Sequence, residues 1–147
     1  MRGSARIVPL LTCSFLIAAP VQAQTTASDE AAIRSALASY AGARLRQDAD
    51  AQAQFYAEYA DFRFDGDGQV VRGREEIEAV LRTSVPPAEF RFTLEVEQVR
   101  FLSPTIALAD ATYGGYSDGY VLYVMVKQED RWLIEAARVA GLPPPSQ

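Results

Sequence analysis

Three side chains of this sequence could carry chemistry: the carboxyl of Asp110, the guanidinium of Arg138 and the phenol of Tyr40. The chain contains no His, and its one Cys is Cys13. The missing His excludes the commonest general base, the commonest metal ligand and any Ser-His or Cys-His nucleophilic pair. What remains is chemistry by a carboxyl group with phenol and guanidinium partners, or binding without catalysis.

Side chains alternate between the two faces of a strand, so Asp110 and Arg138 can each be interpreted as pointing inward or as solvated. Asp110 shares parity with Leu108, so an inward carboxyl would be desolvated and its pKa raised. The alternative is a solvated Asp110 near a bulge or a sheet edge. Arg138 shares parity with Trp132, and an internal Arg138 needs a carboxylate partner, either Asp110 or an acidic ligand. If the strand bulges or frays there, Arg138 is solvated.

Length and composition restrict the class of protein. The 147 residues correspond to one domain, because domains typically hold about 100 to 150 residues. Apolar residues make up 49% and charged residues 22%, which is typical of a globular chain. Fourteen basic residues face nineteen acidic ones, and no basic run is present. Nucleic acid is therefore not an expected partner.

The N-terminus has the pattern of an export signal. Arg2 and Arg6 precede an apolar stretch from Ile7 to Ala19, and Val21-Gln22-Ala23 fits the small-x-small rule for signal-peptidase cleavage. We predict a signal peptide over residues 1–23 and a periplasmic or secreted mature chain without membrane attachment. The alternative is a lipoprotein anchored through Cys13. Cleavage removes the only Cys and two Arg, which leaves 12 − 19 = −7 charges.

The first half of the mature chain predicts helices, because apolar residues recur there at helical spacing. The first helix begins at the N-cap Ser28, and another begins after Gly73. Between them we expect a shorter helix from Ala53 to Tyr59 and a strand from Asp61 to Phe64. The apolar stripes consist of Ile33, Leu37 and Tyr40 in the first helix and Ile77, Val80 and Leu81 in the last.

The second half predicts strands, because apolar and polar residues alternate at period two. Four strands are expected, over residues 90–101, 105–116, 120–127 and 132–139. In the first of them the apolar parity slips by one after Glu97, which indicates a β-bulge. Helices followed by an antiparallel meander predict an α+β domain over residues 24–142, with helices on one face of a curved sheet. Residues 143–147 form a Pro-rich tail.

The stretch from Val121 to Val126 is apolar on both faces of its predicted strand. One face should contact the helices. The other needs a covering loop or a second subunit, and we expect a homodimer through the sheet.

Short motifs in a fixed order resemble a known superfamily. They are Asp29-Glu30-Ala31-Ala32-Ile33, Phe55-Tyr56-Ala57 before Ala60-Asp61-Phe62, Gly73-Arg74-Glu75-Glu76-Ile77 and Trp132-Leu133-Ile134. With Tyr40 in the first helix, they resemble the small bacterial SnoaL-like and SgcJ/EcaC-type members of the nuclear transport factor two-like superfamily over residues 28–140. The resemblance implies a cone-shaped, cystatin-like fold with a pocket. It does not fix a function, because the fold hosts isomerases, epoxide hydrolases, polyketide cyclases and non-catalytic binding modules.

The catalytic patterns of two such branches are incomplete here. The steroid-isomerase pattern needs an Asp base and an oxyanion hole made of Tyr and a protonated Asp. Tyr40 falls on the Tyr position, but the base position falls on Phe64, one residue before Asp65. The second acid position falls near Leu122 or Tyr123. The epoxide-hydrolase pattern of Asp, Arg and Asp finds Asp110 and Arg138 but no third acid.

The sequence therefore predicts an exported, dimeric domain that binds a small apolar or weakly acidic molecule, with no cofactor and no metal. One alternative is an isomerase, cyclase or hydrolase that uses Asp110, Tyr40 and Arg138. Another is an interaction module whose interior is packed solid. The predicted pocket residues are Tyr40, Tyr56, Phe62, Asp110, Tyr123, Trp132 and Arg138.

Overall fold

The computed structural model describes residues 21–63, 68–84, 89–115 and 118–141. Residues 1–20 of the predicted signal peptide, the isomerase-pattern positions Phe64 and Asp65, and the predicted tail at 143–147 lie outside these ranges. The elements in chain order are α1 (Val21–Leu45), α2 (Ala49–Ala53), β1 (Tyr56–Arg63), β2 (Val70–Arg72), α3 (Arg74–Thr83), β3 (Phe92–Ser103), β4 (Ile106–Gly115), β5 (Gly119–Gln128) and β6 (Arg131–Gly141).

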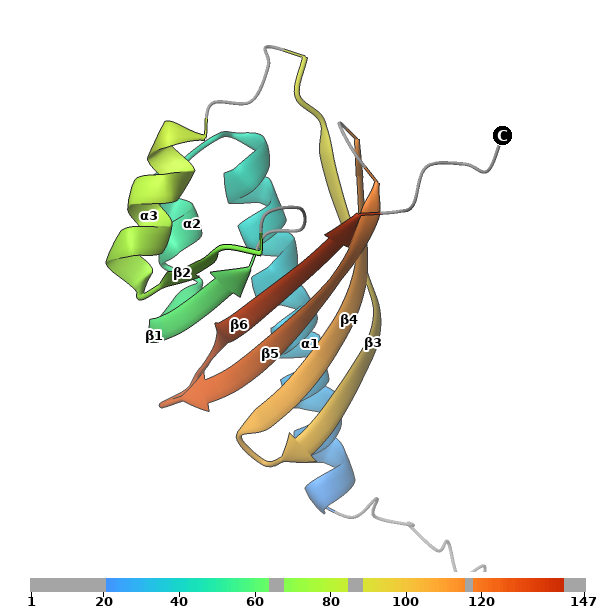
Figure 1. The fold of residues 1–147 in the computed structure, drawn as a ribbon. Coiled ribbons are helices and arrows are strands. Elements are labelled where there is room, and N and C mark those ends of the chain that lie inside the picture. Colours follow the sequence, from blue (N-terminus) through green and yellow to red (C-terminus); the bar gives the residue numbers. More distant parts are fainter. Residues whose placement is uncertain (1–20, 64–67, 85–88, 116–117, 142–147) are drawn as a thin grey trace, which may run out of the picture.

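The strands form one sheet in the order β2-β1-β6-β5-β4-β3. Figure 1 shows α1 crossing one face of this sheet, with α2 and α3 beside the β1–β2 end. The predicted α+β class and the antiparallel meander from β3 to β6 are confirmed. The sheet as a whole is mixed, because β1 runs parallel to β6. No hairpin joins these two strands, so no tight turn forces them to be antiparallel.

Helix α1 begins earlier than predicted. It starts at Val21, so Ser28 lies inside the helix and the prediction of Ser28 as its N-cap is wrong. No Gly or Pro occurs between Val21 and Ala41, and nothing in that stretch stops the helix from extending backward. Asp29, predicted for the first turn, accepts hydrogen bonds from Lys127 Nζ at 2.7 Å and Trp132 Nε1 at 3.1 Å. These contacts attach α1 to the β5–β6 hairpin.

The helix predicted from Ala53 to Tyr59 is wrong over most of its length, because α2 lies earlier in the chain and residues from Tyr56 on belong to a strand. Asp48 caps α2 by accepting a hydrogen bond from the Ala51 amide at 3.0 Å, and α2 ends at Ala53. Tyr56 and Tyr59 therefore belong to β1, where Tyr56 is buried and Tyr59 exposed. Burial in a strand explains the aromatic residues better than a helical stripe does.

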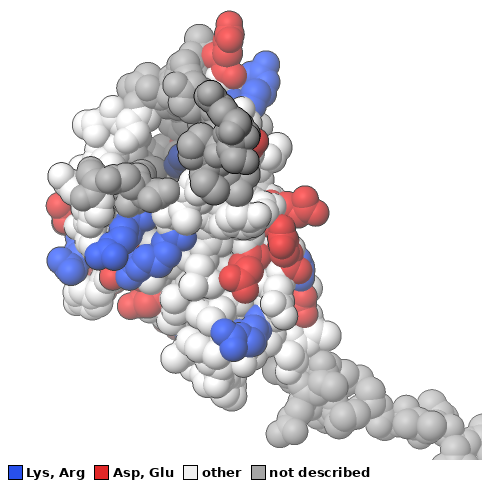
Figure 2. Space-filling model, turned by 45° about the vertical axis from the view of Figure 1, so that its right-hand side comes forward, with Lys and Arg blue, Asp and Glu red and all other residues white. Residues whose placement is uncertain are grey.

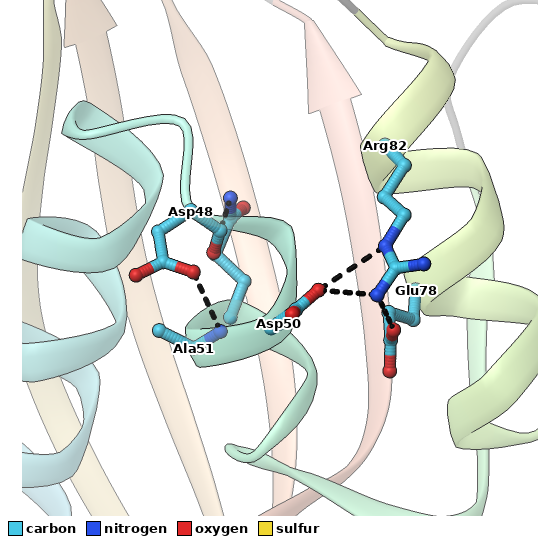
Figure 3. Close-up of polar contacts among 6 residues, drawn as sticks. Asp48, Asp50, Ala51, Glu78 and Arg82 are labelled. Carbon is cyan, nitrogen blue, oxygen red and sulfur yellow. Dashed lines mark hydrogen bonds and ion pairs between the residues drawn. The ribbon is translucent and has the colours of Figure 1, made fainter.

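An ion pair between exposed side chains connects α2 to α3 (Figure 3). Arg82 of α3 lies 2.6 Å from Asp50 of α2 and 2.6 Å from Glu78 one turn earlier in its own helix. The predicted start of α3 after Gly73 is confirmed. Strand β2 was not predicted, because at three residues it is too short to show a period.

The bulge predicted in β3 is confirmed. Val96 pairs with Ala111 and Gln98 pairs with the adjacent Asp110, so Glu97 is the extra residue. Val99 and Phe101 then occupy the same face as Val96. The bulge keeps the apolar side chains of both halves of β3 against the core.

The contact of Asp29 with Lys127 should make stability depend on pH. The hydrogen bond from Lys127 holds the pKa of Asp29 below its ordinary value of 3.8, with partial burial opposing and the Trp132 indole assisting. A lowered folded-state pKa means that this stabilisation is present above pH 3.8 and is lost as the pH falls through the folded-state value. We therefore expect Asp29→Asn to destabilise the protein at neutral pH and to have a smaller effect in acid.

Urea unfolding of the native protein and the variant at neutral and acid pH measures this difference. Asp50→Asn is the matched control, because the side chains of Asp50 and Arg82 are 71% and 58% exposed and exposed pairs contribute little. A loss of stability in Asp29→Asn that is the same at both pH values would contradict the prediction.

Candidate functional site

Three tyrosines from different elements meet between α1 and the sheet, and we refer to Tyr40, Tyr56 and Tyr123 as the tyrosine cluster. The Tyr40 ring meets the Tyr56 ring edge to face at 5.8 Å and the Tyr123 ring at 6.3 Å. The hydroxyls of Tyr40 and Tyr56 lie 3.1 Å apart, within hydrogen-bond distance. All three side chains are at most 3% exposed. The structure thus brings together three of the predicted pocket residues.

Two hydroxyls of the cluster, those of Tyr56 and Tyr123, are neutral groups. Burial raises the pKa of Tyr56 and of Tyr123 well above the ordinary value. Both phenols are therefore protonated at physiological pH and can donate hydrogen bonds, but they cannot serve as bases. In the described part of the chain, the buried side-chain atoms without a hydrogen-bond partner are Nε of Arg44 and Oε1 of Gln52. Buried polar groups without a partner are rare in native proteins.

Arg44, one helical turn after Tyr40, adds a positive charge to this region. Its guanidinium carbon lies 4.8 Å from the centre of the Phe92 ring and 5.9 Å from that of Phe90. Its Nε is buried and has no hydrogen-bond partner among the described residues. The charge also acts on Tyr123 and Tyr56, whose phenol pKa values it lowers against the larger effect of burial. Arg44 therefore belongs to the same region as the tyrosine cluster.

The spacing of residues in α1 contains a signal for Arg44 that a search for apolar residues alone does not detect. Ile33, Leu37 and Tyr40 are the apolar stripe of α1, and position 44 continues their spacing of four, three and four residues. A helix places residues at this spacing on one face. An arginine on the buried stripe of a helix is unusual and indicates a functional or ion-pairing role.

Asp110 lies on the opposite face of the sheet from the tyrosine cluster. Ala107, Ala109 and Ala111 of β4 are buried, whereas Asp110 is exposed. The interpretation of Asp110 as an inward, desolvated acid is therefore wrong, and the solvated alternative holds. The inward interpretation rested on the parity that Asp110 shares with Leu108, and Leu108 is only half-buried. The buried cluster that contains these alanines also includes larger side chains such as Leu37, Tyr123 and Met125, and small residues on β4 leave room for them.

Arg138 also lies on this outer face. Ile134 pairs with Met125 and Ala136 with the next residue Val124, so Glu135 forms a bulge in β6. The bulge reverses the parity of the strand, and Ala137 is buried where Arg138 is exposed. The carboxylate partner of Arg138 is Asp61 of β1, not Asp110.

Asp110 and Arg138 nevertheless line the same hollow. It has a volume of about 290 Å³, and its lining also includes Glu97, Tyr120 and Leu122. The register places Asp110 opposite Leu122 and Leu122 opposite Arg138, which puts the three side chains in one row across the sheet. Tyr40 is on the helix side, so the sheet separates it from the two other predicted catalytic residues.

The remaining predicted pocket residues lie away from the cluster or at its edge. Trp132 donates to Asp29, eleven residues before Tyr40 on α1, which corresponds to about 16 Å of helix. Its ring meets Phe101 edge to face at 5.8 Å. Phe62 lies 6.3 Å from the Tyr56 ring. Phe62 also lines an apolar cavity of about 10 Å³ with residues of α3, which is no larger than about one water molecule.

Within the described ranges, no group of three or more His, Cys, Asp or Glu could hold a metal ion. Among the described helices, none is long and apolar enough to cross a membrane. In the same part of the chain, the hydrogen-bond and ring partners of the tyrosine cluster and of Arg44 include no carboxylate. The arrangement can donate hydrogen bonds to a ligand and can balance a negative charge.

Comparison with known proteins identifies a family. Residues 25–139 match the model of the SnoaL-like domain. No curated protein matches the chain. A domain of unknown function with a cystatin-like fold from Nostoc punctiforme is 28% identical, with a TM-score of 0.69 over 80% of this chain and 80% of its own.

Two further solved structures are similar in fold. An NTF-2 like protein of unknown function from Shewanella oneidensis is 21% identical, with a TM-score of 0.67 over 76% of this chain and 98% of its own. A ketosteroid isomerase-like protein from Erwinia carotovora atroseptica is 18% identical, with a TM-score of 0.64 over 78% of this chain and 96% of its own. The predicted cystatin-like fold is confirmed.

Proposed function

Because the chain belongs to the SnoaL-like domain family, we propose that it is an exported small-molecule-binding domain. The ligand is a small apolar or weakly acidic molecule that contacts the tyrosine cluster. We further propose that the mature protein begins at Gln24 and is periplasmic or secreted, and that it forms a homodimer through the outer face of its sheet.

One observation carries the binding proposal. The Tyr123 side chain is buried on the helix side of the sheet, beside two other phenols, and burial keeps its hydroxyl protonated by raising its pKa, so that it can donate a hydrogen bond. Leaving such a group unpaired costs free energy, typically about 1–3 kcal/mol. A ligand that accepts this hydrogen bond would avoid that cost.

Catalysis by Asp110, Tyr40 and Arg138 has less support. The sheet separates Tyr40 from the other two residues. The high pKa of Tyr56 and of Tyr123, which burial causes, makes both phenols unsuitable as bases at neutral pH. A solved structure named ketosteroid isomerase-like shares the fold, but fold similarity at 18% identity does not carry an activity.

We propose no nucleic-acid partner, because the face drawn in Figure 2 carries charges of both signs. Figure 2 shows Lys and Arg atoms grouped at the left of the face it draws and Asp and Glu atoms grouped right of centre, with uncharged surface between them. A phosphate backbone needs a continuous basic surface.

Native mass spectrometry of the mature protein secreted from its own host tests the proposal. We expect a chain that begins at Gln24 and carries a discrete extra mass. Tyr123→Phe should retain the fold and lower the affinity for the identified ligand about three- to tenfold, the loss of one hydrogen bond. Tyr120→Phe, at an exposed phenol of the same strand, should not change it.

Other outcomes would count against specific parts of the proposal. A chain that retains residues 1–23 would contradict cleavage and export. A protein without extra mass that also releases a product would favour the enzyme alternative. A bound mass that Tyr123→Phe does not affect would place the ligand elsewhere.

A further inference from the structure

We infer that Arg44 is the anion-binding group of this domain and that its ligand is a small planar organic anion, an aromatic or unsaturated monocarboxylate. This inference rests on the proposed binding function and specifies the chemical class of the ligand.

Arg44 carries a charge that no described carboxylate balances. Among the described arginines, Arg34, Arg82 and Arg138 are paired with a carboxylate, whereas others such as Arg74 and Arg131 donate to backbone carbonyls. Arg44 has no ion pair with any described residue, and its Nε is buried without an acceptor there. Arg44 as a whole is half-buried, and a buried N–H without an acceptor costs free energy that a ligand can recover.

The surroundings of Arg44 favour an anion with a flat apolar body. Phe90 and Phe92 stack with their rings 6.2 Å apart and 8° from parallel. The guanidinium lies over the Phe92 ring at 4.8 Å. Attraction to a ring face offsets part of the cost of burying the charge but supplies no hydrogen-bond acceptor. A carboxylate supplies two acceptor oxygens in the geometry of a guanidinium, and a planar body can pack against the rings.

The tyrosine cluster fits the same ligand class. Burial raises the pKa of Tyr56 and of Tyr123, so both phenols are neutral donors at physiological pH. A carboxylate or a conjugated oxygen can accept from a phenol and from a guanidinium together. A small inorganic anion such as phosphate would leave the rings without a packing partner, so the site favours an organic anion.

Isothermal titration of the full mature protein with benzoate and with its neutral isostere benzamide tests the inference. We expect benzoate to bind and benzamide to bind at least tenfold more weakly. Arg44→Met retains an unbranched aliphatic stem and removes the charge. It should weaken benzoate binding about ten- to a hundredfold, the range for hydrogen bonds to charged groups. Arg46→Met is the matched control, since Arg46 is an exposed arginine just after the C-terminal end of α1, and it should bind benzoate like the native protein.

A second measurement separates a binding role from a structural one. Without ligand, the melting temperature of Arg44→Met should be equal to or higher than that of the native protein, because the variant no longer holds an unpaired charge against the core. If Arg44 mainly holds Phe90 and Phe92 in place, the variant should melt at a lower temperature, and the inference would be overturned.

The outcomes distinguish this inference from the proposed function. Equal binding of benzoate and benzamide, or unchanged benzoate binding by Arg44→Met, overturns the role of Arg44 but leaves a small-molecule site in place. If neither probe binds while the protein from its host carries a neutral ligand, the inference again fails alone. If neither probe binds and no extra mass is found, both fail.

Discussion

Replacing Ala109 by leucine is expected to lower the free energy of unfolding by about 1–3 kcal/mol or more, the usual range for overpacking a core. Ala109 is fully buried on the helix side of β4, in one cluster with Leu37 and Tyr123. Because Ala109 is fully buried, the added carbon atoms must contact these neighbours. Protein interiors are close-packed, so the added volume must move side chains or backbone.

Asp110→Leu is the matched control, because the same side chain enters at the adjacent residue. Asp110 is exposed on the outer face, and surface substitutions usually change stability by no more than about 0.5 kcal/mol. We expect Asp110→Leu to stay within this range or to be more stable than the native protein. Urea unfolding of both variants at one protein concentration measures the difference. If Asp110→Leu were the more destabilising variant, residue 110 and not residue 109 would face the core.

This pair of variants tests which face of β4 is buried, a question that hydrophobic alternation left open. The alternation located the strand but could not choose its buried face, because both faces are apolar over most of its length. Leu108 and Ile106 are more hydrophobic than the alanines between them, and only the volumes of residues distant in sequence decide which set faces the core. The pattern within one strand contains no information about these volumes.

Bulges explain a second difference between prediction and structure. The bulge at Glu97 was predictable because the strand is long enough for its apolar parity to be seen on both sides. The bulge at Glu135 was not, because Trp132, Leu133 and Ile134 are all apolar and all buried. Three consecutive buried residues show no alternation, so no change of parity is visible. The face of the sheet on which Arg138 lies depends on the one extra residue, Glu135.

The three residues of the tyrosine cluster were among the predicted pocket residues, but Arg44 beside them was not. Tyr40 was identified because it lies on a helical stripe, and the family resemblance supported the same position. The role of Arg44 could not be found by looking for apolar periodicity, since a charged residue counts there as an interruption. A search for charged residues that continue an apolar stripe would have found it, and such residues are a useful signal for binding sites.

The outer face of the sheet carries many apolar side chains, and it is the surface through which we expect the protein to dimerise. Its residues in β3 to β5 include Leu102, Ile106, Leu108, Tyr120, Leu122, Val124 and Val126, and Leu102 and Tyr120 are 58% and 55% exposed. An apolar surface of this kind typically contacts another protein. A second copy of the chain presents the same surface and can bury it symmetrically.

Val124→Glu is therefore expected to convert a dimer into a monomer. Val124 lies between Leu108 and Ala136 in the register of the sheet, away from both ends of β5. A carboxylate there would be brought against its symmetry mate inside the interface, and burying the two like charges costs far more than one apolar contact contributes. Gln128→Glu adds the same group at the exposed end of β5 and should leave the dimer intact.

Sedimentation equilibrium of the three proteins gives their masses in solution, and circular dichroism shows whether the variant remains folded. A folded monomer for Val124→Glu beside dimers for the native protein and Gln128→Glu would support assembly through this face. A dimeric Val124→Glu would place the interface elsewhere. A monomeric native protein would refute the dimer. The apolar residues on the outer face of β5 would then not be covered by a second subunit.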